Sequence, residues 1–152
     1  MIKHLKNARK FAHEYNFDSG LEYNLCAIIV KGGNILSVGH NKRSTNAFVE
    51  HFADLARGER DCCLSAHAEL DAICAARTKN DLRKSKIYVT RIKSSGELGM
   101  ARPCPICELA IKSYGIKRAY YTIDNFHYGV TRPGNLEETK DQIIRHKFQD
   151  QL

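Results

Sequence analysis

Ser65-Ala66-His67-Ala68-Glu69, together with Arg102-Pro103-Cys104-Pro105-Ile106-Cys107, is the pair of segments around which the chain is organised. The alanine-rich residues 66–77 favour a helix with Leu70, Ile73 and Cys74 on one side. Pro105 favours the start of a second helix, because the first position of a helix does not need a backbone N–H. The sequence therefore places one histidine, one glutamate and two cysteines near the starts of two helices.

The chain before these motifs predicts a helix and a β-hairpin. In residues 2–15, apolar side chains recur at spacings of three and four, which is typical of an amphipathic helix. Residues 23–30 form a short apolar run with a β-branched end, and residues 35–38 begin a second strand. The turn Gly32-Gly33-Asn34 joins the two strands into a hairpin. The polar connection 42–63 is expected to include some local helix.

After the first motif, strands and helices are expected to alternate. Residues 86–92 and 118–123 are apolar and β-branched or aromatic, which predicts two strands. Residues 94–99 are rich in serine and glycine and predict a loop between the first strand and the second motif. The helix that follows this motif should end at Gly115.

The C-terminal part predicts a loop and a last helix. Residues 124–134 should form a loop that could include a short strand. Asn135 with Glu138 is typical of a helix cap, and an apolar stripe follows it at Leu136, Ile143, Ile144 and Phe148. A hairpin followed by two right-handed crossovers predicts an α/β fold, with one mixed sheet of about five strands and helices on both faces. Residues 1–152 should form a single domain.

The composition is that of an ordinary soluble globular protein, with 43% hydrophobic and 27% charged residues. No apolar run approaches the roughly 20 residues of a membrane span, and the polar start Met1-Ile2-Lys3-His4 is unlike a signal peptide. A cytoplasmic protein without a membrane partner is expected, in which the six cysteines are thiols or metal ligands. The net charge of +7 favours an anionic partner, either nucleotide phosphate or polynucleotide, with a solvated basic surface as the alternative.

The order His-x-Glu and then Pro-Cys-x-x-Cys resembles the zinc-binding signature of the cytidine and deoxycytidylate deaminase superfamily. The resemblance implies a three-layer α-β-α fold and a Zn²⁺ cofactor, in agreement with the predicted order of elements. It implies that His67, Cys104 and Cys107 are the metal ligands, with the fourth position left for water. It also implies that Glu69 is the catalytic residue, which takes a proton from water, passes it to ring N3 of cytosine and helps ammonia leave.

Each half of the pattern also has a simpler interpretation. A lone Cys-x-x-Cys could be half of a structural zinc site or a redox pair, and a lone His-x-Glu is common by chance. A redox pair would directly follow a strand, whereas a glycine-containing loop precedes Cys104, and a closed zinc site would need a fourth protein ligand. His51, Cys62 and Cys63 raise the alternative of a second zinc, but they lack a clean ligand spacing, so buried or loop cysteines are the simpler interpretation.

Two candidates for substrate contacts lie beside the predicted hairpin and the first motif. The superfamily often has Gly-x-Asn after the second strand, so Gly39-His40-Asn41 makes Asn41 a candidate contact for the sugar or base. A plain turn residue is the alternative. By resemblance, the backbone N–H of Ala68 is the donor to the base carbonyl.

Three more candidates come from the second half of the chain. Arg102 could bind a substrate phosphate or point to solvent. Phe126 and His127 belong to the aromatic segment 120–128. Either could stack on a base, because loops after the strands of mixed sheets often border ligand sites, or it could simply pack in the core.

The predicted reaction is the zinc-dependent hydrolytic deamination of cytosine to uracil in a nucleotide or nucleoside. Deoxycytidylate (dCMP) is the first candidate substrate, because the basic charge suits a phosphate and because Pro-Cys-Pro-x-Cys with His-Ala-Glu-Leu resembles deoxycytidylate deaminases. The short segment between Asn41 and His67 departs from several of those enzymes, which carry a long insertion there.

Two other functions stay open. One is a nucleobase deaminase that acts on single-stranded DNA, on RNA or on adenosine in transfer RNA. The other is a zinc-containing binding module without catalysis, which would have no need of Glu69. The resemblance further implies that the chain assembles as a homo-oligomer.

Overall fold

The structure is a computed structural model, and it describes residues 2–14, 23–42, 46–55, 67–132 and 141–148. Four helices lie in these ranges: α1 (Ile2–Glu14), α2 (Ala47–Leu55), α3 (Ala68–Ala76) and α4 (Pro105–Ser113). The strands are β1 (Tyr23–Lys31), β2 (Asn34–His40), β3 (Lys86–Lys93), β4 (Leu98–Gly99), β5 (Arg118–Asp124), β6 (His127–Thr131) and β7 (Gln142–Arg145). None of the helices described has the length and apolar character needed to cross a bilayer.

The strands form one mixed sheet in the order β2-β1-β3-β5-β6-β7, with β4 paired to β3. Strand β1 is antiparallel to both β2 and β3, and β3 is parallel to β5. Strands β2, β3 and β5 therefore run in the same direction, and α3 and α4 lie in the connections between them. The carboxyl ends of such strands share one edge of a sheet, which is where ligand sites of open α/β sheets form.

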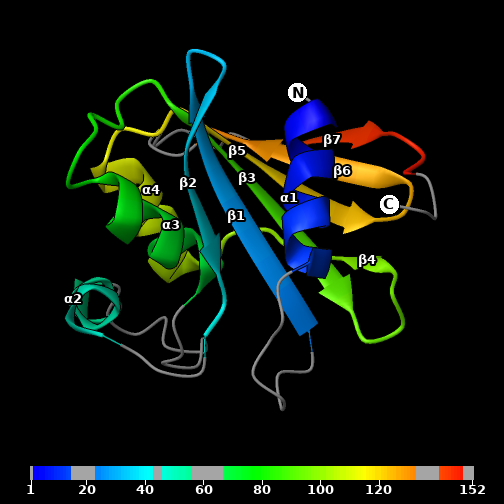
Figure 1. The fold of residues 1–152 in the computed structure, drawn as a ribbon, viewed down its shortest axis with the longest axis horizontal. Helices are drawn as coiled ribbons and strands as arrows, with labels where there is room; N and C mark the ends of the chain where they lie inside the picture. Colours follow the sequence, from blue (N-terminus) through cyan, green and yellow to red (C-terminus); the bar gives the residue numbers. More distant parts are fainter. Residues whose placement is uncertain (1, 15–22, 43–45, 56–66, 133–140, 149–152) are drawn as a thin grey trace.

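Alternating residues of the strands face two separate cores. On one face, Cys26, Ile28, Tyr88 and Tyr120 pack with Leu5, Ala8 and Ala12 of α1. On the other face, Ala27, Ile29, Val89 and Tyr121 pack with α2, α3 and α4. Figure 1 shows α1 apart from these three helices, which are grouped together beyond β1 and β2. The predicted α/β fold with helices on both faces of a mixed sheet is confirmed.

The C-terminal segment differs from the prediction. The part of the expected last helix that lies in residues 135–140 is outside the described residues, but residues 142–145 form β7 rather than a helix. They pair antiparallel with β6, so that Tyr128 faces Ile144 across the two strands. The β-branched pair Ile143 and Ile144 suits a strand. The open edge of β6 offers backbone hydrogen-bond partners to this segment, and the pattern of apolar residues within the segment does not reveal such pairing.

The sheet has seven strands rather than about five. The two strands that were not expected are β4 and β7. Residues 98–99 pair with Arg91 and Ile92 of β3 within the segment that was predicted to be a loop. Residues 127–131 form β6, the short strand for which the predicted loop 124–134 left room. Short paired segments of this kind carry little periodicity, so sequence patterns indicate them poorly.

Candidate metal centre

Helix α3 begins at the point where the first motif predicts. His67 has an extended backbone, with φ −83° and ψ 151°, and Ala68 is the first helical residue. The helix buries apolar side chains around most of its circumference, because it is packed between the sheet and α4. Glu69 is only 4% exposed, although a carboxylate is rarely buried without a partner. The helix start therefore holds His67 and Glu69 in a fixed position inside the protein.

Gly39 allows α3 to lie directly on β2. A Cβ atom at this position would overlap the backbone oxygen of Ala68 and the backbone nitrogen of Ala72. The close approach is secured by the Ser37 hydroxyl, which donates a hydrogen bond of 2.8 Å to the carbonyl of Ala72. The glycine of the Gly-x-Asn sequence thus sets the distance between the strand and the helix that carries His67.

Asp71 joins the end of β2 to the first turns of α3. Its Oδ2 atom accepts a hydrogen bond of 3.0 Å from the backbone N–H of His40. Its Oδ1 atom lies 2.9 Å from Nζ of Lys42. The sequence pattern alone does not indicate this role of Asp71, because the helix dipole already accounts for an acidic residue early in a helix.

Helix α4 begins as the second motif predicts. Cys104 is the extended residue before the helix, with φ −71° and ψ 167°, and Pro105 is the first residue of the helix. The backbone N–H of Glu108 donates to the carbonyl of Cys104 at 2.8 Å, which closes the first turn. Cys107 is fully buried in that turn. The Cys-x-x-Cys spacing therefore brings both sulfur atoms to the same end of the helix.

The two helix starts converge on three side chains. Nδ1 of His67 lies 3.2 Å from Sγ of Cys107 and 3.3 Å from Sγ of Cys104. All three potential ligand atoms lie within 4.8 Å of one another. With Zn–N near 2.0 Å and Zn–S near 2.3 Å, tetrahedral ligands lie roughly 3.5 Å apart. The nitrogen and sulfur donors and their separations both fit a zinc ion, and among the described residues no other group of this kind occurs.

The two thiols differ in their electrostatic environment. A hydrogen bond from Cys107, assisted by His67, lowers the pKa of Cys104 to about 3. Burial raises the pKa of Cys107. Cys104 therefore holds the thiolate, and the start of α4 adds partial positive charge beside it. A thiolate next to a histidine is the form of the donor set that a divalent metal binds.

Glu69 lies beside the same cluster. Burial raises its pKa, and the charge of His67 and a hydrogen bond with Cys107 act in the opposite direction. The carboxyl group is thus within hydrogen-bonding distance of one predicted ligand and enclosed by the protein. A group in this environment can take up and release a proton close to the cluster.

Arg102, which precedes the motif, is held by an acidic side chain. Its Nε donates to Oδ2 of Asp141 at 2.6 Å, and its NH2 group lies 3.6 Å from Oε1 of Glu108. The hydroxyl of Tyr121 donates to the same oxygen of Asp141 at 2.5 Å. The guanidinium therefore lies in an ion pair at the start of α4. No sequence pattern indicates this role of Asp141, which falls within the segment that was expected to be helical.

Asn41 and Ala68 both lie close to the start of α3. Asn41 is only 7% exposed, and its Oδ1 accepts a hydrogen bond of 2.9 Å from the backbone N–H of Leu25. This bond continues the β1–β2 pairing beyond His40. The N–H of Ala68 belongs to the first turn of α3, where N–H groups have no partner within the helix.

Phe126 and His127 lie in and after the turn between β5 and β6. Phe126 is 48% exposed. Nδ1 of His127 lies 2.9 Å from Oδ1 of Asp124, and the carbonyl of Phe126 accepts from the N–H of His146 at 2.8 Å. Their polar contacts within the described residues are with this turn and the segment after β7. The structure does not bring these two side chains into contact with the three predicted metal ligands.

Comparison with known proteins agrees with this arrangement. The family described as the cytidine and deoxycytidylate deaminase zinc-binding region matches residues 2–123. The apo structure of the dCMP deaminase from the cyanophage S-TIM5 is similar at 25% sequence identity and a TM-score of 0.52, covering 80% of this chain and 81% of that one. The cytidine deaminase from Burkholderia pseudomallei shares the fold at 17% identity and a TM-score of 0.53, covering 95% and 92%. No curated protein sequence matches the chain.

Proposed function

Because the chain belongs to the cytidine and deoxycytidylate deaminase zinc-binding family, we propose that it catalyses the zinc-dependent hydrolytic deamination of cytosine to uracil, with dCMP as the first candidate substrate. One observation carries the proposal. The imidazole of His67 and the sulfur atoms of Cys104 and Cys107 converge within 4.8 Å, and the carboxyl group of Glu69 is buried beside them.

The chemistry divides between the cofactor and the chain. When bound by His67, Cys104 and Cys107, Zn²⁺ would bring the pKa of a water molecule to roughly 7. Glu69 would accept a proton from water as the water oxygen attacks C4 of cytosine. The same carboxyl group would then give this proton to ring N3, take up the proton of the new hydroxyl group at C4 and pass it to the 4-amino group, which leaves as ammonia. Water and cytosine are thereby converted to uracil and ammonia, and Glu69 returns to its starting state.

The rest of the proposed site orients the base. The N–H of Ala68 is directed out of the start of α3 and is the proposed donor to the base carbonyl. Asn41, which follows β2, is the proposed contact for the sugar or the base. Arg102 is paired with Asp141, so we assign it first to holding the segment before Cys104 in place and only second to binding phosphate.

A nucleotide is favoured as the substrate by two observations. The chain has a net charge of +7, which suits an anionic ligand. The cyanophage dCMP deaminase has also been crystallised in complex with dCMP and dUMP, and its fold matches this chain with a TM-score of 0.52 at 24% identity over 79% of this chain and 78% of that one.

The test is a substrate panel for the zinc-loaded protein. Cytidine, deoxycytidine, CMP, dCMP, single-stranded DNA and RNA are each incubated with the enzyme, and ammonia and uracil are measured. We expect turnover of dCMP, and a lower kcat/KM for deoxycytidine, which lacks the phosphate. Turnover only on a polymer would replace the nucleotide proposal by an editing deaminase. Retention of zinc without turnover of any substrate would favour a binding module.

A further inference from the structure

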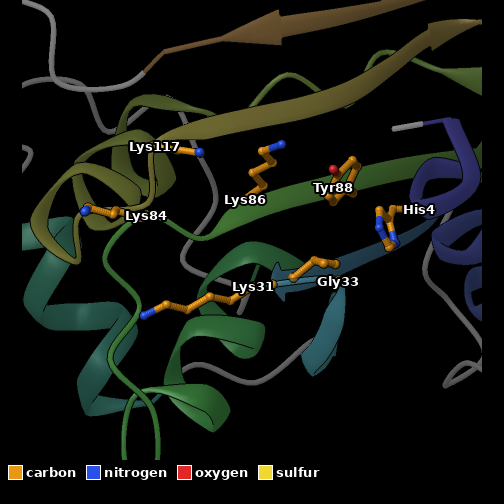
Figure 2. A pocket seen from close by; sticks show the side chains of 9 residues that line it. His4, Lys31, Gly33, Lys84, Lys86, Tyr88 and Lys117 are labelled. Carbon is orange, nitrogen blue, oxygen red and sulfur yellow. The ribbon is translucent and has the colours of Figure 1, made fainter.

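A polar pocket lies at the other end of the strands from the metal centre. It has a volume of about 290 Å³. Its walls come from the start of α1, the β1–β2 turn, the start of β3 and the residue before β5, as Figure 2 shows. The lining includes His4, Lys31, Lys84, Lys86, Tyr88 and Lys117. Strand β3 runs from Lys86 to Lys93 and rises about 3.3 Å per residue, so the two ends of the sheet lie roughly 20 Å apart.

The charged side chains that line this pocket are all positive. Four lysines line it, and no aspartate or glutamate does so. Lys31 donates a hydrogen bond of 2.7 Å to the carbonyl of Asp81. For Lys84, Lys86 and Lys117, the part of the chain that the structure describes offers no ion-pair partner. Arg118, which faces Lys86 across the parallel strands, adds a further positive charge. Mutual repulsion among these groups is relieved when an anion lies between them.

His4 of α1 forms another part of the pocket wall. Its Nδ1 atom is buried and has no hydrogen-bond partner among the described residues. Its ring lies 4.9 Å from that of Tyr88. Burial lowers the pKa of His4, and the positive charges of the N-terminus, Lys3 and then Lys86 act in the same direction. The Nδ1 nitrogen is shielded from solvent, so His4 contributes a wall of the pocket and not a contact for the anion.

The backbone next to the lysines is held in an unusual conformation. Lys84 has a φ of 65°, in the left-handed region that a lysine seldom occupies. Its N–H donates to the carbonyl of Gly115 at 3.0 Å, and the N–H of Lys117 donates to the carbonyl of Ser85 at 2.9 Å. These bonds fix the chain at both Lys84 and Lys117. Strained residues that the surroundings hold in place are common at ligand clamps.

We propose that this pocket binds a small anion that carries two or three phosphate groups, at a site separate from the metal centre. Lysine ammonium groups are compact point charges that bind phosphate without a demand for bidentate geometry. The pocket volume of about 290 Å³ is just below the roughly 300–1,000 Å³ of ordinary ligand pockets, which suits a phosphate chain better than a complete nucleotide.

A polynucleotide fits the pocket less well. Proteins that bind single strands place exposed aromatic side chains along a basic groove, so that the bases can stack on them. Tyr88, the aromatic residue of β3 in the lining, is only 2% exposed and stacks instead on Tyr120, with ring centroids 4.7 Å apart. The pocket therefore offers charge without a stacking platform, which favours a small polyphosphate.

Calorimetric titration of the zinc-loaded protein with sodium tripolyphosphate tests the proposal. We expect saturable binding to the wild type, weaker binding of inorganic phosphate, and a loss of affinity of at least about tenfold in the Lys86→Gln, Lys117→Gln double variant. Removing even one charge-assisted hydrogen bond corresponds to about that factor. Both lysines lie outside the proposed catalytic site, so the deamination of dCMP should be unchanged in this variant.

A matched control separates a site from a general charge effect. The Lys10→Gln, Lys112→Gln double variant removes the same charge from exposed positions of α1 and α4, and it should bind tripolyphosphate as the wild type does. Equal weakening in both double variants, or the absence of binding to the wild type at millimolar tripolyphosphate, would overturn the proposal. Binding of oligothymidylate in place of tripolyphosphate would also overturn it. Zinc is measured after each titration, because polyphosphates chelate metals.

Discussion

The Nε atom of Arg102 donates a hydrogen bond of 2.6 Å to Oδ2 of Asp141, a residue that lies 39 positions later in the chain. The hydroxyl of Tyr121 donates to the same oxygen. Asp141 therefore connects the segment before Cys104 to the middle of the sheet and to the start of β7. The position of one predicted metal ligand depends in this way on a distant part of the sequence.

Replacing Asp141 by asparagine is expected to lower the free energy of unfolding by about 1 kcal/mol at neutral pH. The estimate is modest because the Arg102 side chain is 42% exposed and solvent screens the ion pair. Burial alone would raise the pKa of Asp141, but hydrogen bonds from Arg102, Tyr121 and Thr131 outweigh it and hold this pKa below the ordinary value. Such a group adds stability above the ordinary aspartate range near pH ~4, and the stability is lost as the pH falls through the folded-state pKa.

Urea unfolding of the wild type and of Asp141→Asn, from neutral pH into the acid range, measures this effect. The difference between the two proteins should be largest near neutrality and should close in acid. Glu97→Gln, an exposed carboxylate in the turn between β3 and β4, is the control and should show little difference at any pH. A difference for Asp141→Asn that persists in strong acid would mean that the carboxylate charge is not the cause.

Gly39→Ala is expected to destabilise the protein by about 1–3 kcal/mol or more and to weaken metal binding. The added methyl group meets the backbone of α3 at Ala68 and Ala72, and a backbone cannot move aside as a flexible side chain can. Helix α3 must shift, and His67 shifts with it. Urea unfolding and zinc analysis of the purified variant measure the two effects.

Gly96→Ala is the matched control for the change at Gly39. Gly96 has a φ of +87° and nothing within 4 Å of an added Cβ, so alanine there should cost about 1 kcal/mol through backbone strain alone. Zinc content should not change in this control. If Gly39→Ala retained full zinc and wild-type stability, the packing of α3 on β2 would not fix the position of His67.

The elements that the sequence predicts well are those with a strong local pattern. Helix α1 and strands β1, β3 and β5 carry regular apolar spacings, and their apolar residues do face the two cores. The prediction of a last helix was wrong because Ile143 and Ile144 fit the apolar stripe of a helix as well as they fit a strand. Pairing with β6 decides between the two, and this pairing is not local.

The residues of the candidate site also fall into two groups, those that a local sequence pattern indicates and those that it does not. His67, Cys104 and Cys107 are recognisable from their order in the chain, and the structure brings them together. Asp71 and Asp141 act on backbone or side chains 31 and 39 positions away, so nothing in their neighbouring sequence reveals them. Residue patterns thus predict which chemical groups are present, whereas the supports that hold these groups come from contacts between distant segments.

Cys104→Ala is expected to lose zinc. The wild type should bind about one zinc per chain, because three protein ligands and an open position describe a single mononuclear site. Inductively coupled plasma analysis of dialysed protein measures the stoichiometry. Cys74→Ala, which removes a thiol on α3 away from the cluster, should retain the metal. Equal zinc in Cys104→Ala and the wild type would show that the ligand assignment is incorrect.

Glu69→Gln should separate proton transfer from metal binding. Glutamine preserves the shape of the buried side chain but cannot take up a proton, so kcat should fall by roughly 10²–10⁴-fold, the range for a lost general acid–base group. Zinc content and thermal stability should stay close to those of the wild type, because Glu69 lies beside the three predicted ligands without belonging to them.

Glu108→Gln is a matched control in the first turn of α4, 3.6 Å from Arg102, and it should retain most of the activity. If Glu69→Gln and Glu108→Gln were equally active with zinc bound, another group would have to carry the proton. Loss of zinc in Glu69→Gln would instead mean that the carboxylate helps to hold the metal.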